Sequence, residues 1–307
     1  MNTRLSKAIL AALVLGGIAS TAALAGEINP NVNVQMRPTG KGWGEVVSDA
    51  HGPISTAVAA GGITNHGGPV IASTVNVYLI WYGNNWGTLS GTQARNILTN
   101  LAGSIGGTPY YNINKTYAGV TGAVHYAGST SVAGGSKKPL SDSNILTIAQ
   151  NAVKSAFGNV VDPNGLYFVL TSSEVKKSGF GTSYCGWHSH ASFLGGDMKY
   201  SFVGDPSVQY PNNCGAQVLG PNGNSGGDAM ASVFAHELEE TNTDPDLNAW
   251  YDSAGAENAD LCAWTFGTES TAGNGAKYNV TMGGSQYLIQ QNWNYNATVS
   301  LQKCAMQ

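Results

Sequence analysis

Long runs of β-branched and aromatic residues predict strands that are buried on both faces. The clearest run, residues 75–82, ends at Gly83, as expected for a strand that leads into a turn. Shorter runs of the same kind predict further strands at residues 123–126, 166–170 and 200–203. Two late strands are expected at residues 287–290 and 297–301.

Apolar residues at helical spacing predict three helices between and after these strands. The expected ranges are residues 92–105, 142–157 and 229–241. Ser90, Ser141 or Asp142, and Asp228 are the expected residues at their N-terminal ends. Strands and helices alternate early and give way to a loop-rich final third. We therefore predict an α/β fold with a single mixed-sheet domain over residues 71–307.

The first 25 residues have the layout of a secretory signal peptide. Arg4 and Lys7 precede a short apolar run, and residues 23–25 fit a cleavage site. Residues 26–70 are rich in Gly, Pro, Asn and Thr, which predicts an irregular segment or a pro-segment. No later apolar run reaches about 18 residues, so no membrane span is expected. We expect a secreted, extracellular protein, with the periplasm as an alternative.

The composition is that of a folded, mildly acidic protein. Of the 307 residues, 42% are hydrophobic and only 10% charged, which is enough for a sizeable core. The formal net charge is −4, which is unfavourable for contact with a phosphate backbone. We therefore expect no nucleic-acid partner, and the sequence leaves the oligomeric state open.

Four cysteines suggest two disulfides in an exported chain. Three pairings can be drawn. We favour Cys185–Cys214 and Cys262–Cys304, because neighbours in sequence close the shorter loops. The second pair would fasten the loop-rich C-terminal third. The chain has no C-x-x-C pair, so we expect no zinc–thiolate site.

The third predicted helix carries the segment His236-Glu237-Leu238-Glu239-Glu240. Positions i and i+4 of a helix share one face, so His236 and Glu240 point the same way. This is the geometry of the H-E-x-x-H zinc helix with its second His replaced by Glu, which is also a suitable ligand. Glu237 lies beside them, where it could take a proton from a zinc-bound water as general base. The alternative is a solvated helix face with one histidine.

Carboxylates are concentrated around this helix. Eight of the 18 acidic residues fall between Glu237 and Asp260, and no Lys or Arg lies between Tyr200 and Ala276. A bound cation is the economical way to balance so many packed carboxylates. We therefore expect a metal ion here, with zinc as the first choice.

A catalytic zinc ion takes three protein ligands and a water, so a third ligand is needed. Asp246 follows His236 at the ten-residue spacing of metzincins, although Thr243 stands at their glycine position. Glu257 with Asp260 resembles the gluzincin layout, in which a Glu binds zinc and an Asp orients the first His. We favour Glu257 and keep the other acids as candidates.

His188 and His190, expected on a disulfide-pinned loop, could also reach the metal. Either could instead hydrogen-bond the oxyanion or the substrate. Residues 244–248 begin like a calcium loop, D-x-D-x-N, but lack the Gly and the Glu that an EF-hand needs at positions six and twelve. A structural calcium ion in this acidic segment is therefore a second expectation.

Several pieces of the chain resemble the EXORDIUM family, also called the phosphate-induced family. They are His66-Gly67-Gly68-Pro69-Val70, residues 75–83, the predicted helix from Thr92, Cys185-Gly186-Trp187-His188, residues 200–204 and residues 262–267. The resemblance spans most of residues 66–307. It implies a secreted protein, because the plant members are cell-wall or apoplastic proteins linked to growth control. It implies location and fold but no catalytic activity.

The order of strands and helices before the third helix is also similar to a zincin core, of the metzincin or gluzincin kind. Together with the H-E-x-x-E helix, this similarity leads to the hypothesis of a secreted zinc-dependent metallopeptidase that acts on a peptide or protein substrate. The rival hypothesis is a non-catalytic extracellular module. Such a module would hold a structural ion and bind a cell-wall polymer, a carbohydrate or a protein.

Overall fold

The computed structural model of this protein describes residues 62–135 and 138–307. Its centre is a five-stranded sheet in the order β3-β2-β4-β6-β5. The strands are β2 (Val75–Tyr82), β3 (Val124–Val132), β4 (Gly165–Thr171), β5 (Gly186–Phe193) and β6 (Gly196–Gly204). Four of them run parallel, and β5 pairs antiparallel with β6 at one edge. The predicted α/β class and mixed sheet are confirmed.

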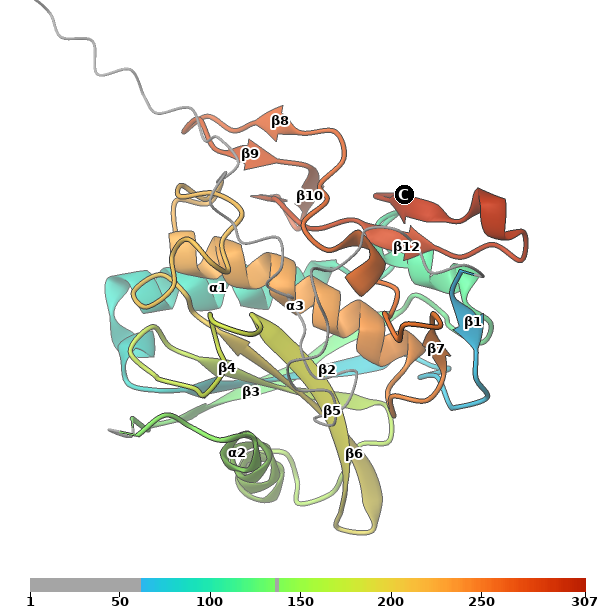
Figure 1. Cartoon of the computed structure of the whole chain (residues 1–307). Coiled ribbons are helices and arrows are strands. Elements are labelled where there is room, and N and C mark those ends of the chain that lie inside the picture. The colour runs from blue at the N-terminus through green and yellow to red at the C-terminus, as the bar shows by residue number, and fades with distance from the viewer. Residues whose placement is uncertain (1–61, 136–137) are drawn as a thin grey trace, which may run out of the picture.

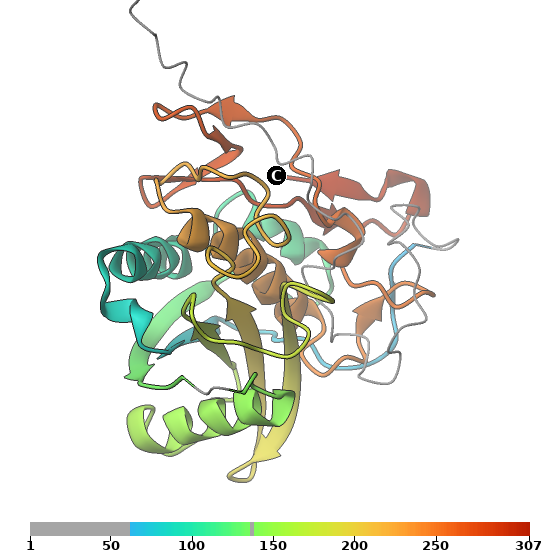
Figure 2. The ribbon, with the colours of Figure 1, turned by 60° about the vertical axis from the view of Figure 1, so that its left-hand side comes forward.

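Helices cover both faces of the sheet. Helices α1 (Leu89–Ser104) and α3 (Ser225–Thr243) lie on one face, and α2 (Asp142–Ala156) lies on the other (Figure 1, Figure 2). The central strand β4 is buried at every position, since side chains on both of its faces meet a helix layer. Phe168 of β4 stacks on Phe234 of α3 with ring centroids 4.1 Å apart.

Helix α3 runs through the interior of the protein. Asn224 caps its N-terminus, because the Asn224 side chain accepts a hydrogen bond from the backbone N–H of Gly227 at 2.8 Å. The helix ends at Thr243, just before Asp244 and Pro245. Every residue from Gly226 to Thr243 is buried, polar ones included. The sheet lies on one side of α3, and the C-terminal segments lie on the other (Figure 1).

Those C-terminal segments form small two-stranded ladders and single turns. The ladders are β1 (Thr64–Asn65) with β7 (Trp250–Tyr251), β8 (Ser270–Thr271) with β9 (Lys277–Tyr278), β10 (Val280–Met282) with β11 (Ser285–Tyr287), and β12 (Asn292–Asn294) with β13 (Lys303–Ala305). The 3-10 helices η3 (Asp260–Cys262) and η4 (Val299–Leu301) also belong to these segments, whereas η1 (Asn85–Gly87) and η2 (Tyr111–Thr116) precede β3. This region is as loop-rich as predicted.

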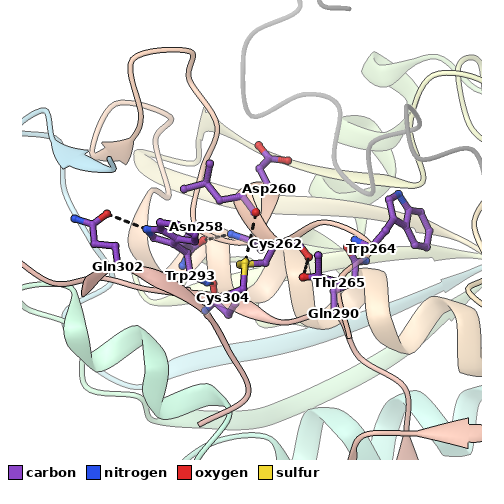
Figure 3. The surroundings of a disulfide bond; sticks show 12 residues. Asn258, Asp260, Cys262, Trp264, Thr265, Gln290, Trp293, Gln302 and Cys304 are labelled. Carbon is purple, nitrogen blue, oxygen red and sulfur yellow. Dashed lines mark hydrogen bonds between the residues drawn. A yellow bond between two sulfur atoms is a disulfide. The ribbon is translucent and has the colours of Figure 1, made fainter. Parts of the chain in front are cut away.

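Both favoured disulfides are present. Cys185–Cys214 fastens the start of β5 to the loop before α3. Cys262–Cys304 joins η3 to β13, beside Trp293, whose indole N–H donates to Gln302 Oε1 at 2.9 Å (Figure 3). Paired cysteines of this kind are typical of oxidising compartments. Among residues 62–135 and 138–307, no helix has both the length and the apolarity to span a membrane.

Some local predictions were wrong. The helix expected from Ser90 begins at Leu89 with Thr88 as its N-cap, and α3 begins at Ser225, four residues before the expected start at 229. Residues 288–290 form no strand, and residues 299–301 form a 3-10 helix instead of a strand. The predicted signal peptide over residues 1–25, and most of the predicted irregular segment 26–70, lie outside the described residues.

Candidate metal centre

The second half of α3 faces β5 through a set of buried ionisable side chains. We call His188, His236, Glu237, Glu240, Glu257 and Asp260 the inner cluster. Asp260 is 6% exposed, and the other five are at most 1% exposed. The inner cluster thus contains every candidate named from the sequence except Asp246 and His190.

The i, i+4 pair of the H-E-x-x-E motif meets as its spacing predicts. His236 Nε2 lies 2.9 Å from Glu240 Oε1. The two atoms are nevertheless not oriented for a hydrogen bond, and within the described part of the chain neither ring nitrogen of His236 has a hydrogen-bond partner. Two potential ligand atoms this close without a hydrogen bond resemble two ligands of one cation.

His188 comes from strand β5 and not from a loop, which corrects the expectation from sequence. Side chains alternate along a strand, so His188 faces α3 while Trp187 turns to the other face and packs against Phe202. His188 Nδ1 lies 3.4 Å from Glu237 Oε2 and 3.6 Å from Glu240 Oε2. The strand therefore brings a second imidazole to the motif.

The chain returns to the cluster after α3 and supplies two more acids. His188 Nε2 lies 3.6 Å from Glu257 Oε1, and His236 Nε2 lies 3.8 Å from Asp260 Oδ1. The backbone N–H of Asp260 donates to Glu240 Oε1 at 3.1 Å. Asp260 belongs to η3, the turn that the Cys262 disulfide fastens to β13 (Figure 3).

Burial and mutual charge both shift the pKa values of these groups, and for His236 and Glu240 the two effects oppose each other. Burial raises the pKa of Glu237 to about 8 and that of Glu257 well above its usual range. Burial alone would lower the pKa of His236, but the charge of Glu240 raises it to about 9. Burial opposes ionisation of Glu240, yet the two histidines hold its pKa at about 2. The pair His236–Glu240 is thus the ionised centre of the cluster.

Several carboxylate oxygens of the cluster face no hydrogen-bond donor. Within the described residues, Glu237 Oε1, Glu240 Oε2 and both oxygens of Glu257 have no hydrogen-bond partner. A buried carboxylate oxygen without a donor is costly, and a metal ion removes that cost. Ligand atoms about 2.0–2.2 Å from a tetrahedral zinc ion lie roughly 3.3–3.6 Å apart, close to the separations within this cluster. The donor set of imidazoles and carboxylates also fits zinc.

Asp246 and His190 lie in a different group at the surface. We call His190, Asp197 and Asp246 the outer cluster. His190 Nδ1 lies 3.0 Å from Asp197 Oδ1 and 3.8 Å from Asp246 Oδ1, and Lys199 Nζ lies 2.9 Å from Asp197 Oδ2. A cation is thus already present in this group. The structure does not bring Asp246 together with His236, and sequence reasoning did not identify Asp197.

The acidic loop after α3 directs its carboxylates to different partners. Asp244 Oδ1 accepts hydrogen bonds from the backbone N–H groups of Asn248 at 2.6 Å and Ala249 at 2.7 Å. Asp246 turns toward His190. The D-x-D-x-N segment therefore folds as a turn around the carboxylate of Asp244, and its acids do not converge on one point.

Glu239 was counted among the acids but given no role, and it lies on a different face of α3. Its Oε2 accepts a hydrogen bond from the hydroxyl of Tyr110 at 3.1 Å, and Asn114 Nδ2 donates to its backbone carbonyl at 3.0 Å. Burial raises the pKa of Glu239 well above its usual range. The spacing carried no signal of this separation, because positions i+3 and i+4 of a helix both lie near position i.

The family follows from comparison with known proteins. The model of the phosphate-induced protein 1 conserved region matches residues 63–305. The chain belongs to this family. It is 30% identical over 272 residues to protein EXORDIUM-like 5 of Arabidopsis thaliana, a match covering 75% of each protein. It is also 30% identical over 269 residues to protein EXORDIUM-like 3 of the same plant, which covers 75% of this chain and 80% of that protein.

A shorter match links the chain to protein EXORDIUM of Arabidopsis thaliana, with 33% identity over 168 residues, 48% of this chain and 51% of that protein. No solved structure matches. Family membership confirms the resemblance seen in the sequence. The proposed chemistry of the site therefore rests on the residues of the inner cluster.

Proposed function

We propose that this member of the phosphate-induced protein 1 family is a secreted zinc-dependent hydrolase that cleaves peptide bonds. The observation that carries the proposal is the approach of His236 Nε2 to Glu240 Oε1 at 2.9 Å without a hydrogen bond. These donor atoms stand in a buried site that also holds His188 and Glu257. Two disulfides and the signal-peptide layout of residues 1–25 support export.

The residues divide into ligands and a base. His236 and Glu240 would hold the ion, with Glu257, Asp260 or His188 completing the set. A bound zinc ion supplies a Lewis acid and lowers the pKa of a bound water to about 7. Glu237 is not required as a ligand and would accept the proton of the attacking water. Its pKa of about 8 without a metal is set by burial, and a nearby cation would lower it and keep the carboxylate ionised. The order of strands and helices around α3 supports a zincin-like core.

The first test is the metal content of the purified protein and of His236→Ala, measured side by side by mass spectrometry. We expect zinc in the wild type and its loss in the variant. Glu237→Gln should then retain zinc and lose hydrolysis of a peptide library. Equal zinc in wild type and His236→Ala would contradict the metal site. Hydrolysis that survives Glu237→Gln would contradict the role of Glu237.

One observation favours a second function. The ligand side chains are almost fully buried, and a structural metal site is closed whereas a catalytic site keeps an open position. A non-catalytic extracellular module with a structural ion, which binds a cell-wall polymer or a protein, accounts for that burial. It predicts that Glu237→Gln keeps full binding to isolated cell wall. It also predicts that the wild type shows no metal-dependent peptide hydrolysis, so a chelator should not change the result of a peptidase assay.

A further inference from the structure

The two histidines of the inner cluster approach different oxygens of one carboxylate. His236 Nε2 lies 2.9 Å from Glu240 Oε1, while His188 Nδ1 lies 3.6 Å from Glu240 Oε2. Each histidine also has a second acid nearby. Asp260 Oδ1 lies 3.8 Å from His236 Nε2, and Glu257 Oε1 lies 3.6 Å from Nε2 of His188, the other nitrogen of that ring. His188, Glu240 and Glu257 each offer one ligand atom within 4.8 Å of the others. Glu240 therefore stands between two separate three-residue donor sets.

We propose that the inner cluster binds two divalent metal ions bridged by the carboxylate of Glu240. The first ion would be held by His236, Glu240 and Asp260, and the second by His188, Glu240 and Glu257. This inference rests on the proposed metal site and adds to it the number of ions and the role of Glu257. Glu237, whose Oε2 lies 3.4 Å from His188 Nδ1, is close to both sets; the proposal assigns it to neither and keeps it as the base.

Charge also favours more than one ion once the carboxylates are ionised. Glu237, Glu240, Glu257 and Asp260 then carry four negative charges, and the sequence has no Lys or Arg between Tyr200 and Ala276. Histidines that bind a metal are neutral, so they do not offset this charge. One divalent ion would then leave an excess of two negative charges in a buried site, which is costly. Two divalent ions would balance the four carboxylates.

The contacts of Glu257 indicate that it is a ligand and does not merely orient His188. A carboxylate that orients a metal-binding histidine does so through a hydrogen bond to the other ring nitrogen. His188 Nε2 instead has a hydrogen-bond contact with the backbone carbonyl of Asp244 at 3.3 Å. Both oxygens of Glu257 lack a hydrogen-bond partner within the described residues, although the side chain is 1% exposed. An ion of its own satisfies this carboxylate.

Two bridged ions would also be suited to hydrolysis. In two-metal sites, which include those of aminopeptidases, the ions stand about 3.5–4 Å apart. Each oxygen of Glu240 approaches a different histidine, which suits a carboxylate that bridges two ions. The chain would use α3 for the first ion and β5 for the second, with Glu240 common to both.

The test is the number of ions per chain after saturation with zinc and removal of loosely bound metal. We expect about two ions in the wild type and about one in Glu257→Gln, which keeps the volume of the side chain but not its charge. His236→Ala should also fall to about one, and the double variant to none. Circular dichroism checks that each variant is folded.

The outer cluster provides the matched control, because it too contains a histidine and two acids. Asp197→Asn should leave about two ions per chain. A fall to one in this variant would place the second ion in the outer cluster and overturn the inference. Retention of both ions by Glu257→Gln would overturn it as well.

A spectroscopic measurement on the wild type avoids reliance on variants. Two Mn²⁺ ions about 3.5–4 Å apart are magnetically coupled, whereas a single Mn²⁺ gives an uncoupled six-line signal. A coupled signal supports the bridged pair. One zinc per chain with an uncoupled manganese signal would overturn the second ion and leave the proposed function standing. No bound metal in the wild type would overturn both.

Discussion

Two histidines of strand β5 stand two residues apart on the same side of the sheet, yet their surroundings differ. His188 is fully buried beneath α3 in the inner cluster, and His190 is 39% exposed in the outer cluster. Each cluster combines imidazole with carboxylates. The outer one includes the ammonium group of Lys199, whereas among residues 62–135 and 138–307 the ion pairs of the inner one involve only histidines.

The comparison shows that burial, and not residue type, separates a candidate metal centre from a surface ion pair. In the outer cluster, water and Lys199 can satisfy the carboxylates, so binding of an additional ion would stabilise them little. In the inner cluster, carboxylate oxygens stay without donors unless an ion is bound. Variants of matched residues in the two clusters should therefore behave differently.

The largest difference is expected between His236→Ala and His190→Ala in the presence of a chelator. Removal of His236 leaves the buried carboxylate of Glu240 without its partner, which should cost about 3–5 kcal/mol of unfolding free energy. Removal of His190 breaks only an exposed pair and should cost about 0–1 kcal/mol. Urea denaturation measures both. Equal losses would show that the two clusters do not differ in the way that their burial indicates.

A smaller difference is expected for Glu257→Gln, and it should depend on zinc. Burial raises the pKa of Glu257 well above its usual range, so Gln resembles the neutral acid of the metal-free protein. With chelator the variant and wild type should melt at similar temperatures. With excess zinc the variant should gain less, by about 1.4 kcal/mol for each tenfold loss of affinity. Identical zinc-induced shifts in melting temperature would exclude Glu257 as a ligand.

The pH dependence of the metal-free protein gives a third contrast. The folded-state pKa of Glu237, about 8, lies above its ordinary value of 4.5, so its contribution to stability is complete below pH 4.5 and is lost as the pH rises through 8. His236, with its pKa raised from 6.5 to about 9, changes in the same direction. Chelated wild type should therefore lose stability between pH 5 and 8. Thermal melts of Glu237→Gln should show a shallower slope, and an unchanged slope would contradict this assignment.

The smallest effect is expected in the outer cluster, for Asp197→Asn. Burial opposes its ionisation, but Lys199 and His190 hold the pKa of Asp197 below its usual value. Its contribution is therefore present above the unfolded-state pKa of 3.8 and is lost as the pH falls through the lower folded-state value. At pH 7 the variant should lose less than about 1 kcal/mol. A loss as large as that of His236→Ala would mean that the outer cluster is also a tightly coupled site.

The differences between predicted and observed elements have local physical causes. Strand β5 was missed because Gly186–Phe193 contains the polar run His188-Ser189-His190, which interrupts the alternation of apolar and polar residues that predicts a strand. Residues 288–290 were predicted as a strand because Leu288 and Ile289 are apolar, and all three residues are buried. Their backbone, however, bonds to side chains, as when Ile289 N–H donates to Asn279 Oδ1 at 2.9 Å. Apolarity there predicted burial and not backbone pairing.

The contacts of the candidate site also differ in how far the sequence could predict them. The meeting of His236 and Glu240 was predictable, because one helical turn fixes the neighbours of each residue whatever the rest of the chain does. The membership of His188 was left open, since it depends on β5 being the edge strand beneath α3. The placement of Asp246 with His190 depends on a turn that Asp244 organises through Asn248 and Ala249.

By itself the sequence determined the α/β class, the main strands and helices, the disulfide pairs that close the shorter loops, and the motif on α3. These features depend on periodicity and on contacts close in the chain. Only the tertiary structure decided which acids join the two histidines. Asp260 reaches His236 and Glu257 reaches His188 through a loop whose course is set by packing and by the Cys262–Cys304 disulfide. Burial of the whole cluster was decided there too, since α3 becomes an interior helix only when the sheet and the C-terminal ladders enclose it.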